Sequence, residues 1–168
     1  MHKHALGSTR RPKGSLSHGG WIALHVLGVV VFLGNLIVTA VWKTIADHTR
    51  DPRVIAYAQR LVTVTDISFT ATGAALITLS GFVLADDWGG VGGPTWLTVG
   101  FSLFAATGVI WIAVLIPIQV QQARLARQFA SNEAIPDRYW QLARRWYVFG
   151  AIATLLPLAN IYFMAVKP

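Results

Sequence analysis

Residues 24–35 read LHVLGVVVFLGN, an apolar run that contains one histidine, His25, and ends in one asparagine, Asn35. The run continues on both sides to form an apolar segment over residues 21–42. A helix of roughly 20 residues crosses the ~30 Å hydrocarbon core of a bilayer. The segment therefore predicts a membrane-spanning helix, and it carries two polar groups that a passive anchor does not need.

Three further segments, over residues 62–85, 96–119 and 146–166, have similar length and apolar character. Aromatic residues stand at or near the segment ends, as amphipathic rings do at a membrane interface. They are Trp21, Trp42, Trp88, Trp96, Trp140, Trp146, Tyr147 and Tyr162. The sequence predicts an all-α fold, a bundle of four transmembrane helices in a lipid bilayer.

The composition supports a membrane protein. Of the 168 residues, 54% are apolar and only 12% charged, whereas soluble domains carry roughly 25% charged residues. Cysteine is absent, which excludes disulfides and thiolate metal sites. The net charge of +7 comes largely from basic residues that flank the apolar runs. That distribution suits lipid headgroups, and we expect no nucleic-acid partner.

The chain is expected to form one membrane domain over residues 19–168, preceded by a disordered basic tail over residues 1–18. A signal peptide is the competing interpretation of the first apolar run. The run is longer than the usual apolar core of such a peptide, and no small-residue cleavage site ends it. We therefore expect a retained helix.

Lys and Arg counts favour one orientation. The first and third loops carry nine of these residues, against five in the N-terminal tail and at the C-terminus. Under the positive-inside rule, we expect the first and third loops inside and both termini outside, in a bacterial inner membrane. The basic tail argues against this orientation.

The connections have distinct characters. Residues 46–60 contain a turn at Asp51-Pro52 and then a short helical pattern, either an interfacial helix or a solvated linker. The glycine-rich residues 86–95 predict a flexible outer loop. Pro117 is expected to kink the third helix. The glutamines that follow, Gln119, Gln121 and Gln122, form either a polar exit from the membrane or a polar pocket near the kink.

At 100° per residue, each predicted helix has one side rich in small and polar residues. We expect that side to face neighbouring helices and the aliphatic side to face lipid. On the first helix it holds His25, Gly28, Phe32, Asn35, Thr39 and Lys43; on the second, Asp66, Thr70, Gly73, Ile77 and Ser80; on the third, Gly100, Thr107, Gly108 and Trp111; on the fourth, Gly150, Pro157 and Asn160.

Ionisable residues within membrane segments are functional candidates. We expect Lys43 either to pair with Asp66 as a buried ionisable pair or to snorkel to the surface. His25 is a candidate haem ligand, with a proton relay, a metal ligand and a helix–helix hydrogen bond as alternatives.

We group Asn35 with His25 as a candidate cofactor-binding residue. No other histidine lies in an apolar segment, so a bis-histidine haem within one chain is excluded. A five-coordinate haem, a non-histidine second ligand or a ligand from another subunit stay open. We predict no dedicated metal site and assign no catalytic residue.

The sequence resembles a family of predicted bacterial integral membrane proteins of unknown function. The resemblance extends over roughly residues 21–147. It rests on the histidine and glycines of the first helix, on Asp66 with Phe69 and Thr70, on Ser80-Gly81 and on Pro117 with Gln119.

That family is similar in layout to the bacterial protoporphyrinogen oxidase family and to the copper-resistance D domain. The first resemblance implies haem or porphyrin bound through a first-helix histidine, which maps onto His25. The lysine expected in a later membrane helix of that family is missing here, since no Lys or Arg occurs between Arg60 and Arg124. Too few soft ligands are present for copper.

Two functions follow as hypotheses. One is a small membrane protein that binds haem b or a porphyrin through the first helix. The other is a non-enzymatic subunit or assembly partner of a larger membrane complex, or a homo-oligomer. The sequence favours a protein that is not an enzyme.

Overall fold

The computed structural model describes residues 16–131 and 134–168. Most of the predicted tail, residues 1–15, lies outside the described residues. The helices are α1 (His18–Thr49), α2 (Pro52–Thr65), the π-helix η1 (Asp66–Thr70), α3 (Ala71–Ala85), the 3-10 turn η2 (Asp86–Trp88), α4 (Thr95–Ile110), the π-helix η3 (Trp111–Leu115), α5 (Ile116–Phe129) and α6 (Asp137–Val166).

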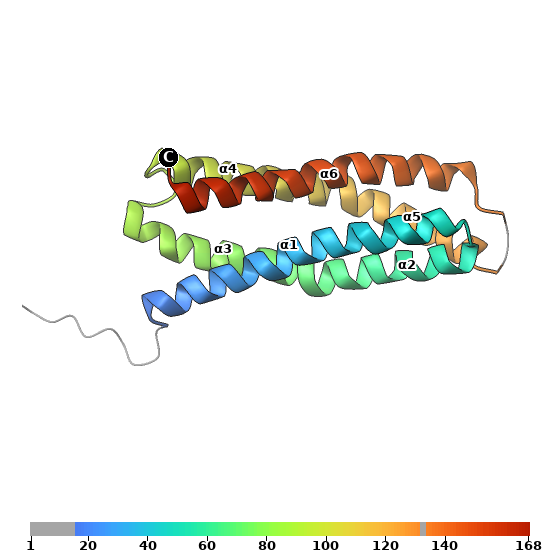
Figure 1. The fold of residues 1–168 in the computed structure, drawn as a ribbon, viewed down its shortest axis with the longest axis horizontal. Coiled ribbons are helices and arrows are strands. Elements are labelled where there is room, and N and C mark those ends of the chain that lie inside the picture. Colours follow the sequence, from blue (N-terminus) through green and yellow to red (C-terminus); the bar gives the residue numbers. More distant parts are fainter. Residues whose placement is uncertain (1–15, 132–133) are drawn as a thin grey trace, which may run out of the picture.

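These elements join into four long helices. The segments α2, η1, α3 and η2 form one continuous helix, Pro52–Trp88, and α4, η3 and α5 form another, Thr95–Phe129. Together with α1 and α6, each is long and apolar enough to cross a membrane. The four-helix bundle predicted from the sequence is therefore confirmed. Figure 1 shows α1 running beside α2 and α3, and α6 running beside α4.

The first connection is shorter than predicted, because the helices extend beyond the apolar segments. Helix α1 continues to Thr49, and Asp51 caps α2 by accepting hydrogen bonds from the backbone N–H groups of Arg53 (2.8 Å) and Val54 (3.4 Å). Pro52 occupies the first turn, where its missing N–H is not needed. Ile55 is completely buried. Residues 46–60 therefore comprise the end of α1, a connection at Arg50 and Asp51, and the first turns of α2.

Two glycines bring α1 and α3 into close contact. A Cβ atom on Gly73 would lie 2.7 Å from the backbone nitrogen of Phe32, and one on Gly28 would lie 2.9 Å from Leu76 Cβ. Only glycine fits at such separations, which is how small residues allow membrane helices to approach each other. The predicted inward side of the first helix is confirmed, because Gly28, Phe32 and three polar residues after them are buried.

The two halves of the bundle differ in packing. Around α2, α5 and the first part of α6, apolar side chains form two clusters centred on Val62, Leu142 and Trp146, and on Ile55, Phe129 and Tyr139. At the opposite end the buried cluster is small and consists of Ala85, Trp96 and Leu97. There α1 packs on α3 and α4 packs on α6, and a cavity lies between the two pairs.

Replacing Gly28 tests the close contact. We expect Gly28→Leu to lower the melting temperature in mild detergent, because the added side chain meets the α3 backbone; overpacking of this kind typically costs about 1–3 kcal/mol. Gly34→Leu on the same helix is the matched control, since nothing lies within 4 Å of a Cβ at that position. Equal melting temperatures for the two variants would contradict the packing described.

Candidate functional site

His25 is held by a residue of the neighbouring helix. Its Nδ1 lies 3.0 Å from Ser80 Oγ on α3. The Ser80 hydroxyl donates its own hydrogen to the carbonyl oxygen of Leu76, one turn earlier. With that hydrogen engaged, the serine oxygen can accept from an Nδ1–H of the imidazole. In this tautomer Nε2 carries the lone pair.

A cavity of about 1070 Å³ adjoins His25. Its walls are the facing sides of α1 and α3 on one hand and of α4 and α6 on the other, and most of its lining is apolar. Aromatic rings span the gap between the helices: Phe32 and Phe104 have centroids 6.0 Å apart, and Phe82 and Phe101 have centroids 5.3 Å apart. The space suits a large, flat, apolar ligand.

A few polar groups line the same cavity. Asn160 Oδ1 is buried and has no hydrogen-bond partner among the described residues. Met164 contributes a thioether. At one end of the cavity the Lys167 ammonium lies 4.6 Å from the ring centroid of Trp88, and His18 pairs with Asp87 at 2.9 Å. The cavity therefore combines an apolar body with charged groups at one end.

Asn35 lies in a different cluster, around Asp66. The Asn35 amide nitrogen donates to Asp66 Oδ1 (3.2 Å) and to Thr70 Oγ1 (2.8 Å), and the Thr70 hydroxyl donates to the same Asp66 oxygen at 3.1 Å. Gln119 Nε2 from α5 donates to the other carboxyl oxygen at 2.6 Å. Trp111 also approaches this carboxyl group. All of the hydrogen-bonding residues are buried.

Both long composite helices change geometry at this cluster. Asp66 is the first residue of η1, and its carbonyl oxygen accepts from the N–H of Ala71. Trp111 is the first residue of η3, and its carbonyl oxygen accepts from the N–H of Ile116. Pro117, two residues after the end of η3, has no N–H to donate to the preceding turn. This explains why the regular α-helical hydrogen-bond pattern is interrupted there. Single π-turns are frequent at functional sites.

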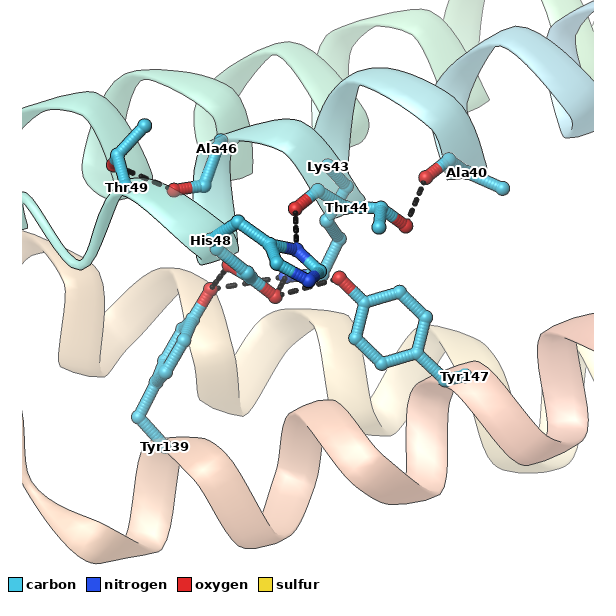
Figure 2. A network of polar contacts seen from close by, with 9 residues as sticks. Ala40, Lys43, Thr44, Ala46, His48, Thr49, Tyr139 and Tyr147 are labelled. Atoms are coloured by element: carbon cyan, nitrogen blue, oxygen red, sulfur yellow. Dashed lines mark hydrogen bonds and ion pairs between the residues drawn. The ribbon is translucent and has the colours of Figure 1, made fainter.

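Lys43 lies in a second buried cluster, nearer the first and third loops. Its ammonium donates to Asp47 Oδ2 (3.0 Å) and to the Tyr139 hydroxyl (2.9 Å). The hydroxyls of Tyr139 and Tyr147 both donate to the Asp47 carboxylate. Figure 2 shows Tyr139 and Tyr147 on α6 pointing toward Lys43 on α1. The Trp146 ring centroid lies 5.5 Å from the ammonium.

The predicted pairing of Lys43 with Asp66 is wrong. Lys43 pairs with Asp47 four residues along its own helix, and Asp66 is bonded by Asn35 and Gln119. Asp66 lies level with Asn35, and Lys43 is a further eight residues along α1, which is about 12 Å at ~1.5 Å per residue. Nor does Lys43 snorkel, since only 1% of its side chain is exposed.

Sequence reasoning missed several members of these clusters. For Gln119 and Gln122 the sequence left open a polar exit or a polar pocket near the kink. Both side chains are buried, whereas Gln121 is exposed. Asp47 could have been found as the residue four positions after Lys43, on the same helix face. Tyr139 has no such local signal, because it approaches Lys43 only through the packing of α6 on α1.

The described part of the chain contains no group of three or more His, Asp or Glu side chains arranged to hold a metal ion. The structure thus separates the predicted site residues into three places. His25 faces the cavity, Asn35 and Asp66 share the central cluster, and Lys43 belongs to the aromatic cluster.

Removing one partner of the Lys43–Asp47 pair should strongly destabilise the protein. Lys43→Met leaves the Asp47 carboxylate buried without its counter-charge, which typically costs about 3–5 kcal/mol. The double variant Lys43→Met/Asp47→Leu removes both charges and should recover part of the lost melting temperature. Arg144→Met, at an exposed position on α6, serves as the control. A double variant less stable than Lys43→Met would contradict a stabilising charge pair.

Comparison with known proteins agrees with this architecture. Residues 22–168 match the family described as "Predicted integral membrane protein (DUF2269)". No curated protein and no solved structure matches the chain. The matched range contains all four apolar helices apart from the first residues of α1. The chain belongs to this family of predicted integral membrane proteins, whose function is unknown.

Proposed function

We propose that this membrane protein binds haem b or a related porphyrin in the cavity between the helix pairs α1/α3 and α4/α6, where His25 would hold the iron. The observation that carries the proposal is the hydrogen bond between His25 and Ser80. When Nδ1 donates to Ser80, Nε2 carries the lone pair that metal coordination requires. A ligating histidine normally has its other ring nitrogen fixed in this way.

The residues around the cavity fit such a group. A porphyrin needs an apolar space with flat aromatic surfaces, and Phe32, Phe101 and Phe104 line the walls. Met164 lines the same cavity and would supply the non-histidine second ligand left open by the sequence. Lys167, at one end of the cavity, would pair with propionate groups.

A bound haem would supply one-electron redox chemistry. The chain's own contribution would be to hold the group in a dry cavity, to orient His25 through Ser80 and to set the polarity around the macrocycle.

Absorption spectroscopy tests this proposal. We expect the protein, expressed with ample haem and purified in mild detergent, to show a Soret band that is lost or shifted in His25→Ala. His48→Ala is the matched control, because His48 lies on the same helix, is exposed and bonds to the Thr44 carbonyl. The absence of a Soret band in the unaltered protein, or an identical band in His25→Ala, would overturn the proposal.

A second variant in the same experiment tests the hydrogen bond between Ser80 and His25. Ser80→Ala removes the hydrogen bond to Nδ1 and should weaken haem binding by about 10–100-fold, the usual effect of losing such a partner. Ser102→Ala provides the control, since this exposed serine bonds only to the Thr98 carbonyl and does not line the cavity.

The same cavity supports a second proposal, that the protein is a non-enzymatic subunit or assembly partner of a membrane complex. The helix pairs α1/α3 and α4/α6 leave apolar surface facing each other without filling the space between them. A partner helix seated there would exclude haem. Co-purification of a defined membrane protein with a haem-free chain would favour this function over the first.

We further propose a bacterial inner-membrane location with the first and third loops inside. The chain contains no cysteine, so a single introduced cysteine reports one position. With a membrane-impermeant maleimide on intact cells, we expect labelling of Gly92→Cys in the second loop. Arg53→Cys at the start of α2 should be labelled only after permeabilisation. The reverse pattern would show the opposite orientation.

A further inference from the structure

We propose that Asp66 is a proton-binding site inside the bundle, and that water reaches it from the end carrying the first and third loops, along Gln122 and Gln59. This inference does not depend on haem binding. The ligand is a proton, which passes from hydronium in the water to a carboxyl oxygen of Asp66 and returns to water when the carboxyl group ionises.

The surroundings of Asp66 provide no counter-charge. The ion pairs within residues 16–131 and 134–168 are Lys43–Asp47 and His18–Asp87. On α1, Lys43 lies about 12 Å further along the helix and is engaged with Asp47. On α5 the next charged residue, Arg124, is exposed, as are Arg144 and Arg145 on α6.

A buried carboxyl group without a cation is neutralised most simply by a proton. The hydrogen-bond partners of Asp66 are two amides and a hydroxyl, from Asn35, Gln119 and Thr70. An amide can present either its oxygen or its nitrogen, so the amides can accept from a protonated carboxyl group as well as donate to an ionised one. The cluster therefore accommodates both states of Asp66.

Two other amides point to water beside this cluster. Gln59 is 1% exposed and Gln122 is completely buried. In both, the side-chain nitrogen and oxygen have no hydrogen-bond partner among the described residues. Leaving four such atoms unpaired would cost about 1–3 kcal/mol each, whereas buried water commonly bonds to polar groups of this kind.

The helix register places these amides in line with Asp66. Helices α2 and α5 are antiparallel, since Asp66 contacts Gln119 at one level and Ile55 clusters with Phe129 at another. On α2, Gln59 lies four residues after Ile55 and seven before Asp66. On α5, Gln122 lies three residues after Gln119 and seven before Phe129. At these spacings each glutamine shares the helix face of those residues. The two amides thus form a polar line within the α2–α5 interface.

A second cavity adjoins this polar line at the end of the bundle that carries the first and third loops. It has a volume of about 570 Å³ and is lined by Gln59, Thr63 and small residues of α5. The exposed side chains of Arg53, Arg60 and Arg127 border it. Beyond Asp66 in the other direction, the tight contact of Gly28 and Gly73 closes the α1–α3 interface. Asp66 and its hydrogen-bond partners do not line the larger cavity beside His25. The route for water therefore runs from the end that carries the first and third loops.

Infrared difference spectroscopy on the full chain in phospholipid vesicles tests the proposal. As the pH is lowered, we expect a carboxyl C=O band that is absent in Asp66→Asn. After transfer to D₂O, this band should shift quickly in the unaltered protein and at least tenfold more slowly in Gln59→Met/Gln122→Met. Gln121→Met is the matched control, because Gln121 is the exposed neighbour on α5.

Thiol accessibility gives a second measurement that does not depend on the double variant folding. Gln59→Cys and Gln122→Cys should react with a small hydrophilic thiol reagent, since the reactive thiolate needs water. Ala153→Cys, buried among apolar side chains on α6, should not react. The proposal is overturned if no band depends on Asp66, if exchange is equally fast in the double variant, or if the two cysteines are as inert as Ala153→Cys.

Discussion

Hydrocarbon offers no hydrogen-bond partner, and this single property of the solvent governs the bundle. Backbone N–H and C=O groups therefore bond to one another within helices. Many buried polar side chains compensate by bonding to one another across helices, as Lys43 does with Tyr139 and Asp66 does with Gln119. The Lys43–Asp47 pair is the clearest case: two opposite charges and two tyrosine hydroxyls satisfy one another in a space from which water is excluded.

The same requirement explains why the bundle has two dissimilar halves. Near the first and third loops, apolar clusters and the aromatic surroundings of Lys43 hold α1, α2, α5 and α6 together. Near the start of α1 and the end of α6, glycine contacts fasten α1 to α3. There α4 packs on α6, and a cavity lies between these two helix pairs. A closely packed half thus continues into a half that contains a cavity. His25 belongs to the open half and Asp66 lies where the two meet.

Sequence patterns predicted the four helices well, because a run of about 20 apolar residues has few alternatives in a bilayer. They also predicted which side of the first helix faces inward, since that depends only on a period of 3.6 residues. Contacts between helices were harder to predict. The predicted Lys43–Asp66 pairing was wrong because two residues on inward faces can touch only if they lie at the same level along the bundle axis. Hydropathy does not show how far one helix is shifted along another.

The same limitation applies to the other partners. Ser80 was placed on the inward side of its helix, but nothing in the sequence matched it with His25. Gln119 was placed just beyond the predicted kink, yet its contact with Asp66 depends on how α5 lies against α2. Of the two π-turns, the one before Pro117 had a local cause in the sequence, whereas the one at Asp66 had none.

Those π-turns have a further consequence for how the chain can vary. Each turn contains about one residue more than a regular helical turn, and one residue corresponds to a rotation of about 100°. Deleting a residue from η1 would restore a regular helix, but it would rotate α3 against α2, so that Gly73 and Ser80 would leave α1 while Gln59 stayed on α5. The extra residues therefore let each half of the bundle keep its own alignment of faces.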